Sequence, residues 1–387
     1  MLDIERPMRN GIYLDNNATT HLTKRVKRAL HEFIDAEPGN PESPHSDGEA
    51  ARMILRAARE RVSNSLNIQE DHVLFTGSGS ESNTYAIGRA LAMLHDDLRA
   101  VVVSDLEHSS IEKGISRIES GSSSVIRAPV LENGRVDVDA IRTACQDGPV
   151  ALFVQWANNE TGVIQPIEAI AQIARESGSY LHVDAAQAFG RIPIDLAEVS
   201  VGSLAITAHK IHGPTGVAAL AFDAKRAFCP VILGGQQEEG LRGGTHNMIG
   251  IRGFHEAVEE RFNDLHGATE RLRELRDEFE ARVLSAEPRC EVQGGSSARV
   301  CNTSCITFFG ADGGAMVAWL DAHGVQCSQT SACRSNRPEP SATLTAMGLS
   351  EADAYSSIRF AVSVLNTADE IDRAVELVIR AYRTLRA

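Results

Sequence analysis

Short apolar runs rich in β-branched residues recur along the first half of this chain, and helical sequence follows each of them. Five of these runs cover residues 73–76, 100–104, 150–156, 180–184 and 203–208. Uniformly apolar strands that alternate with helices are typical of a parallel sheet with both faces covered. Because ligands bind at the carboxyl ends of such strands, the pattern predicts an α/β fold and the edge that carries its site.

The fifth run ends in His209 and Lys210, and a glycine turn follows. A lysine at the end of a buried strand is shielded from water on its backbone side, which suits an amine that forms a Schiff base with an aldehyde cofactor. A single lysine in this place more often points into solvent, so the prediction depends on its neighbours. Asp184 ends the preceding run, where its carboxylate can pair with a protonated pyridine nitrogen, and Gln187 follows three residues later. Together these residues indicate pyridoxal phosphate.

The turn Gly77-Ser78-Gly79-Ser80 joins the first run to a helical pattern. Free backbone amides and the helix dipole at such a turn can bind a phosphate, although most turns of this kind only cap a helix. The second and third runs lead into His108 and Asn159. A strand-end histidine is more often structural, so His108 becomes a candidate only through the repeated pattern.

With these motifs in order, the chain resembles the NifS-like cysteine desulfurases, a group of the class V aminotransferases. The resemblance covers nearly the whole chain. It rests on residues 13–20, 39–43, 76–82, 107–108, 158–162, 182–187, 208–214, 242–245, 331–333 and 356–360. It implies an α/β fold of the fold-type I pyridoxal phosphate transferases, which are similar to aspartate aminotransferase, with a mainly parallel seven-stranded sheet and a smaller α+β domain.

The resemblance also implies roles for single residues. Lys210 would hold the cofactor, Asp184 would pair with its pyridine nitrogen, and Gln187 would contact its phenolic oxygen. His108 would stack on the ring and take part in proton transfer. The phosphate would be bound by Gly79, Ser80, Thr207 and His209, with Thr245 reaching across from the second subunit of a homodimer. The Ala-Thr pair that is usual in the family is Gly79-Ser80 here, and Thr207 replaces a serine.

Substrate binding and sulfur chemistry are implied in the same way. Asn159 and Arg359 would orient L-cysteine, the arginine by a bidentate contact with the α-carboxylate. Cys333 lies in a polar stretch, with Arg334 directly after it and Arg337 four residues after it. A thiol in such surroundings should be partly ionised, so that it attacks the substrate sulfur and leaves as a persulfide. Loop position alone would favour a bystander cysteine, and the resemblance favours the catalytic interpretation.

We also make predictions for Thr330 and Cys327, which precede Cys333 in the sequence. Thr330 stands where the family commonly has glycine, so its side chain is expected to stiffen the loop. Cys327 closes an apolar run, and we interpret it as a structural residue that points inward from a strand, with an auxiliary role in sulfur handling left open. The remaining cysteines form no CxxC pair, so no metal site is expected. They are Cys145, Cys229, Cys290, Cys301 and Cys305.

A chain of 387 residues exceeds a single core and is expected to form two domains. The expected parts are an N-terminal arm (1–22) that packs on the small domain, a large cofactor-binding domain (23–250), and a small C-terminal domain (251–387) with the cysteine loop at about 325–340. One helical stretch is expected at 251–285, and strands at 303–309 and 357–362.

Bulk properties narrow the function. The net charge of −14 repels nucleic acid, so direct binding is not expected. Seven cysteines without a signal-peptide pattern favour a reducing, cytoplasmic compartment. No apolar run approaches the length that spans a membrane.

Two other interpretations stay open. A selenocysteine lyase or another class V enzyme would keep its activity without Cys333, and a non-catalytic scaffold would keep the fold and partners without turnover. Because the sequence ends directly after its last amphipathic helix, we expect no counterpart of the longer tail that housekeeping relatives carry. The sulfur-acceptor protein therefore stays open among iron–sulfur assembly, tRNA thiolation and DNA phosphorothioate modification.

Overall fold

The computed structural model describes residues 11–94, 97–119, 124–223, 228–330 and 340–386. The strands of its large sheet are β2 (Val73–Thr76), β3 (Ala100–Ser104), β4 (Ser124–Ala128), β5 (Ala151–Gln155), β6 (Tyr180–Asp184), β7 (Ser203–Thr207) and β8 (Ala218–Phe222). Their order is β2-β8-β7-β6-β5-β3-β4. β8 runs antiparallel to both neighbours, and the other adjacent pairs are parallel. The expected mainly parallel seven-stranded sheet is confirmed.

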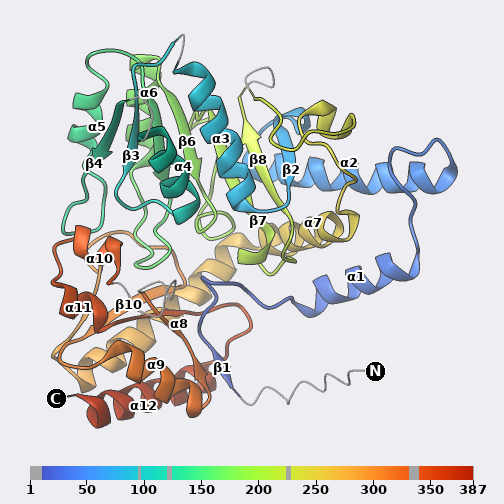
Figure 1. The fold of residues 1–387 in the computed structure, drawn as a ribbon. Helices are drawn as coiled ribbons and strands as arrows, with labels where there is room; N and C mark the ends of the chain where they lie inside the picture. Colours follow the sequence, from blue (N-terminus) through green and yellow to red (C-terminus); the bar gives the residue numbers. More distant parts are fainter. Residues whose placement is uncertain (1–10, 95–96, 120–123, 224–227, 331–339, 387) are drawn as a thin grey trace.

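Helices cover both faces of this sheet (Figure 1). They are α1 (Lys24–Asp35), α2 (Ser46–Leu66), α3 (Gly79–Met93), α4 (Ser109–Glu119), α5 (Val138–Ala144), α6 (Ile167–Ser177) and α7 (Met248–Asn263). In β3, Ala100 and Val102 join the core on one face, while Val101 and Val103 join α3 and α4 on the other. Because every position of the strand is buried, its first four residues are all apolar instead of alternating with polar ones.

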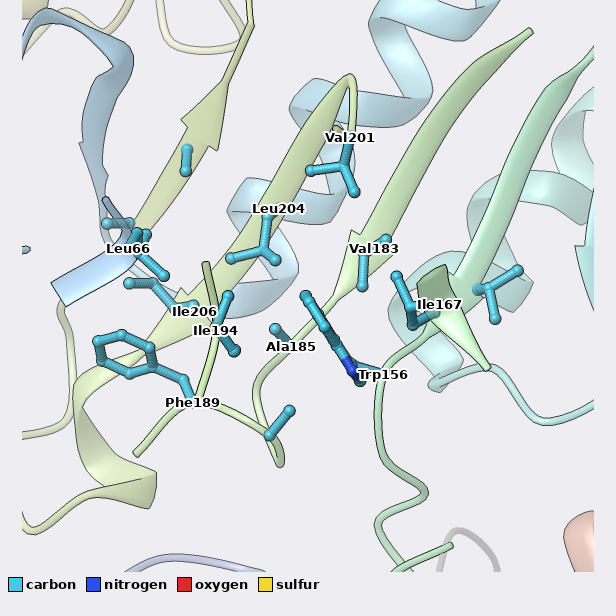
Figure 2. Packing of buried hydrophobic residues seen from close by; sticks show 14 of the residues in the cluster. Leu66, Trp156, Ile167, Val183, Ala185, Phe189, Ile194, Val201, Leu204 and Ile206 are labelled. Atoms are coloured by element: carbon cyan, nitrogen blue, oxygen red, sulfur yellow. The ribbon is translucent and has the colours of Figure 1, made fainter. Parts of the chain in front are cut away.

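The larger core lies between the sheet and the helices α1, α2, α5, α6 and α7. Figure 2 shows Val183, Leu204 and Ile206 beside Trp156 and Phe189 in this core. These side chains are at most 2% exposed. Burial of apolar area on this scale holds the strands in register and fixes where their carboxyl ends lie.

A second unit packs below the large sheet in Figure 1. Its antiparallel sheet has the order β12-β13-β10-β9. The strands are β9 (Cys290–Val292), β10 (Thr303–Phe308), β12 (Ser328–Gln329) and β13 (Ser357–Ala361). The short strand β1 (Ile12–Tyr13) runs parallel to β11 (Val325–Gln326). The helices are α8 (Leu265–Ala286), α9 (Gly313–Ala322), α10 (Ala342–Ala346), α11 (Glu351–Tyr355) and α12 (Ala368–Leu385).

The single helical stretch expected at 251–285 is wrong in one respect, because the chain breaks between α7 and α8 at Asp264. Asp264 has a φ of −143°, and its side chain accepts a hydrogen bond from the Gly267 amide at 3.0 Å. An aspartate in this role is a helix N-cap. The charged residues on both sides of Asp264 continue at helical spacing, so their pattern does not indicate a break. The expected boundaries of the arm and the two domains stay predictions.

The described residues also contain the short 3₁₀ turns η1 (Glu70–His72), η2 (Ala208–Lys210) and η4 (Gln237–Gly240). None of the helices in the described residues is both long enough and apolar enough to cross a membrane.

Candidate active site

A cavity of about 420 Å³ opens at the carboxyl ends of β2, β5, β6 and β7. The predicted site residues that line it are Gly79, Ser80, His108, Asn159, Asp184, Gln187, Thr207, His209, Lys210 and Arg359. Arg359 comes from β13 of the second unit, so both sheets contribute to the cavity. Thr245 does not line it and is exposed. Cys333 lies outside the described residues.

Lys210 ends the short turn η2, directly after β7. Its Nζ atom donates to the backbone oxygens of Asn17 at 2.5 Å and Ala18 at 2.7 Å. Burial and the nearby Arg191 guanidinium lower the pKa of Lys210 to about 7. Near neutral pH the amine therefore loses its proton readily, and a neutral amine is the form that attacks a carbonyl carbon.

Asp184 ends β6, and neighbours fix both of its carboxylate oxygens. Asn83 Nδ2 donates to Oδ2 at 2.8 Å, and the Ala186 amide donates to Oδ1 at 3.0 Å. His182 Nε2 lies 3.0 Å from Asn83 Oδ1, and Ser203 Oγ lies 2.8 Å from His182 Nδ1. Burial lowers the pKa of His182 to about 4, so the ring is neutral at physiological pH.

The neutral His182 ring settles the direction of this chain of hydrogen bonds. Because Asn83 Oδ1 can only accept, His182 Nε2 carries the hydrogen and Nδ1 accepts from Ser203. The amide nitrogen of Asn83 must then point at Asp184. The buried network therefore holds the Asp184 carboxylate toward the cavity, ready for a cationic or protonated partner.

The predicted phosphate site lies where α3 begins. Ser78 caps the helix by accepting from the Glu81 amide at 3.2 Å, and Gly79 and Ser80 form the first turn. A β-carbon added to Gly79 would meet Thr207 alone, at 4.0 Å, so the space above the turn is open. His209 borders the same space, and burial followed by the charge of Lys210 lowers its pKa to about 4. A helix N-terminus with two hydroxyls beside it suits a phosphate.

Arg359 is 8% exposed and is oriented by two contacts. Its Nη2 atom donates to Asp15 Oδ1 at 2.8 Å, and Nη1 donates to the Asn159 backbone oxygen at 3.1 Å. Within the described residues its Nε atom has no hydrogen-bond partner. A buried guanidinium with an unsatisfied donor beside a cavity is suited to a carboxylate ligand.

His108 lies at the start of α4, where the Ser110 amide donates to its Nδ1 atom at 3.2 Å. The preceding residue, Glu107, is buried. Its Oε1 atom accepts from Ser104 Oγ at 2.5 Å and from the Gln155 amide at 2.8 Å. Burial raises the pKa of Glu107 to about 8, so the carboxyl is mostly protonated at neutral pH.

The comparisons with known proteins agree with this geometry. Residues 12–374 match the family described as aminotransferase class-V. The chain belongs to the class-V aminotransferase family. A cysteine desulfurase of Cereibacter sphaeroides is 39% identical to this class-V aminotransferase over 97% of each chain. A solved NifS-like protein has a TM-score of 0.89 at 28% identity and covers 97% of this chain and 100% of its own.

A further solved structure, titled SspA in complex with cysteine, has a TM-score of 0.80 at 29% identity over 92% of this chain and 100% of its own. The chain is thus a class-V aminotransferase of the NifS-like cysteine desulfurase group, and pyridoxal phosphate is the cofactor of this group. The cavity fits that cofactor. Its open helix N-terminus matches a phosphate, Asp184 matches a protonated ring nitrogen, and Lys210 matches an aldehyde.

Sequence reasoning missed two residues of this class-V aminotransferase that shape the cavity. Asn83 lies on the buried face of α3, and a polar residue at a core-facing helical position was the available signal. Asn17 belongs to a quoted motif without a predicted role, yet its backbone oxygen also accepts from Gln187 Nε2 at 3.1 Å. The predicted contact of Gln187 with the cofactor stays a prediction.

The cysteine segment is partly described. Cys327 lies between β11 and β12, packs on the second core and also lines a wider neighbouring cavity with Asp15 and Arg359. The expected inward-pointing position is therefore only half right. Burial raises the pKa of the Cys327 thiol, which keeps it protonated. Thr330 is buried, and its hydroxyl donates to the Ser357 backbone oxygen at 3.4 Å.

Proposed function

We propose that this class-V aminotransferase removes sulfur from L-cysteine, releases L-alanine and carries the sulfur as a persulfide on Cys333. One observation carries the proposal: Lys210, Asp184 and Arg359 line the same cavity. The pKa of Lys210 is lowered to about 7, Asp184 is buried, and within the described residues the buried Arg359 has a donor, Nε, without a hydrogen-bond partner. The similarity to a structure titled as a complex with cysteine supports this choice of substrate.

Ten residues would hold the cofactor. They are Gly79, Ser80, His108, Asn159, Asp184, Gln187, Thr207, His209, Lys210 and, from a second subunit, Thr245. When bound, pyridoxal phosphate supplies an electron sink for negative charge at the substrate α-carbon. Asp184 would hold a proton on the ring nitrogen, because its carboxylate is fixed on two sides and faces the cavity.

The substrate would be oriented by Arg359, which binds its α-carboxylate, and by Asn159. Lys210 would take the α-proton at Nζ, since its lowered pKa leaves a neutral amine available near pH 7. The backbone oxygens of Asn17 and Ala18 hold that amine at the floor of the cavity until it acts. His108 would assist proton transfer from the cavity rim.

Sulfur would leave by attack of the Cys333 thiolate on the substrate sulfur atom. A sulfur–sulfur bond forms, the carbon–sulfur bond breaks, and its electron pair stays on the substrate carbon, which takes up a proton and becomes alanine. The persulfide then passes to an acceptor protein. Iron–sulfur assembly, tRNA thiolation and DNA phosphorothioate modification are the acceptor pathways within the proposal, without direct nucleic-acid contact by this chain.

A cytoplasmic homodimer completes the proposal. Val231, Ile232 and Leu233 are exposed, and Leu233 is 82% exposed. Apolar residues grouped in this way are typical of a surface covered by another chain. Thr245, which is exposed, lies twelve residues after Leu233 and would contact the cofactor phosphate of the neighbouring subunit.

The test compares three variants of the purified holoenzyme. Lys210→Ala should abolish the cofactor chromophore, borohydride labelling and alanine release. Cys333→Ser should keep the chromophore and bind cysteine without transferring sulfur, whereas Cys327→Ser should retain activity. Full desulfurase activity in Cys333→Ser would move the nucleophile to Cys327, and activity with selenocysteine alone in that variant would favour a selenocysteine lyase.

A further inference from the structure

The segment of residues 228–247, which leads into α7, has an unusual backbone. Glu238 and Glu239, within the turn η4, have φ values of 48° and 56°, which lie in the left-handed region. Residues other than glycine rarely adopt this backbone conformation, so two successive glutamates in it require contacts that stabilise them. Thr245 lies in the same segment, a few residues further along the chain.

Glu238 supplies those contacts, because its side chain is only 2% exposed and all of its bonding capacity is used. Arg59 of α2 donates to both carboxylate oxygens, at 2.8 and 2.9 Å. His246 Nε2 lies 2.9 Å from Oε1, and the Phe75 amide of β2 donates to Oε2 at 3.2 Å. Glu238 therefore joins the segment to the body of the large domain and holds the residue next to Thr245.

A second anchor lies closer to the predicted phosphate site. Arg242 Nε donates to Glu81 Oε1 at 3.0 Å, and the Gly77 amide donates to Glu81 Oε2 at 2.8 Å. The segment also closes on itself, since a β-carbon at Gly243 would lie 2.5 Å from backbone atoms of Gly234. A segment held at both anchors and closed in this way presents its outer residues in one fixed arrangement.

The outer residue that matters is Thr245. It is exposed and does not line the cavity of its own chain. We propose that Glu238 is a positioning residue, which fixes His246 and thereby presents Thr245 to the cofactor phosphate of the second subunit. This inference rests on the homodimer and cofactor of the proposed function. The competing possibility is that Glu238 acts within its own chain, through the Phe75 amide and the β2–α3 turn.

Glu238→Gln is the test variant, because glutamine keeps the shape and loses the charge. Glu239→Gln is the matched control, since Glu239 shares the left-handed backbone of Glu238 but is exposed. Pyridoxal phosphate is titrated into each apoprotein and its binding followed by absorbance. We expect about tenfold weaker binding for Glu238→Gln, as for a displaced charge-assisted hydrogen bond, and wild-type binding for the control. Equal affinities for wild type and Glu238→Gln would overturn the inference.

Mixed dimers separate the two possibilities. A Lys210→Ala subunit offers no amine for borohydride labelling, so in a mixed dimer only the cavity of its partner is labelled. When the partner is the Glu238→Gln subunit, that cavity receives Thr245 from a subunit with intact Glu238. We expect wild-type affinity at the labelled site. Affinity as weak as in the Glu238→Gln homodimer would show that Glu238 acts within its own chain and refute the proposal.

A mixed dimer of Lys210→Ala and Thr245→Ala subunits serves as the reference. It should likewise regain wild-type affinity at its labelled site if Thr245 acts between subunits. Failure of this pair, or a wild-type protein that is monomeric or takes up no label, would refute the shared site of the proposed function. Recovery in this pair without recovery in the Glu238→Gln pair would refute the role of Glu238 alone.

Discussion

Glu107→Gln should stabilise the protein progressively as the pH rises. The Glu107 carboxyl is buried, accepts two hydrogen bonds through Oε1, and within the described residues has no partner at Oε2. Burial raises its pKa from 4.5 to about 8. A glutamine keeps the acceptor oxygen for Ser104 and the Gln155 amide, and it cannot ionise.

The sign follows from the proton bound in each state. Between pH 4.5 and about 8 the folded protein keeps the Glu107 proton, whereas the unfolded chain has lost it. Raising the pH in this window therefore lowers the free energy of unfolding of the wild type and leaves the glutamine side chain unaffected. From pH 6 to pH 8.5 the variant should gain roughly 2 to 3 kcal/mol relative to the wild type.

The assay is urea unfolding of both apoproteins at half-unit steps of pH, all above the isoelectric point of about 5.4. Glu42→Gln, which removes an exposed carboxyl, controls for the change in net charge. A stability difference between Glu107→Gln and wild type that stays constant from pH 6 to pH 8.5 would refute a buried, protonated Glu107.

Three other predictions concern the cavity. The rate at which the apoprotein captures pyridoxal phosphate should rise with pH and level off above about pH 7, because burial lowers the pKa of Lys210; stopped-flow absorbance measures it, and a rate still climbing at pH 9 contradicts it. Asn83→Ala should lower the free energy of unfolding by about 3 kcal/mol, since Asp184 and His182 each lose a buried partner, and denaturation at pH 7 would detect it. Gly79→Val should weaken cofactor binding about tenfold by filling the open space at the start of α3, and an unchanged titration would exclude a phosphate there.

Strand-end residues were predictable because the rule that locates them is local. Asp184 and Lys210 each follow an apolar run, and parallel pairing of β6 with β7 brings the two strand ends to one edge. Arg359 could be found only through the resemblance, since it lies on a strand of a different sheet, far along the chain. Nothing in its local sequence points to a cavity that two sheets build together.

Other features lie beyond local patterns for physical reasons. Asn17 holds Lys210 through a backbone oxygen, and a backbone contact requires no particular side chain. Glu107 looks like an ordinary charged residue beside His108, although its burial keeps it protonated. The helix break at Asp264 could not be predicted either, because an aspartate within a charged helical pattern is expected to be one more exposed residue of a helix surface.

The position of Arg359 in β13 makes the proposed recognition of the substrate depend on strand register. Its neighbours Ile358 and Phe360 are buried in the second core, while Arg359 itself faces the cavity. Successive residues of a strand alternate between its two faces. Inserting one residue ahead of Arg359 would therefore turn the guanidinium into the apolar core and an apolar side chain toward the cavity. A change in length within this short strand would therefore remove the proposed carboxylate-binding group from the cavity in one step.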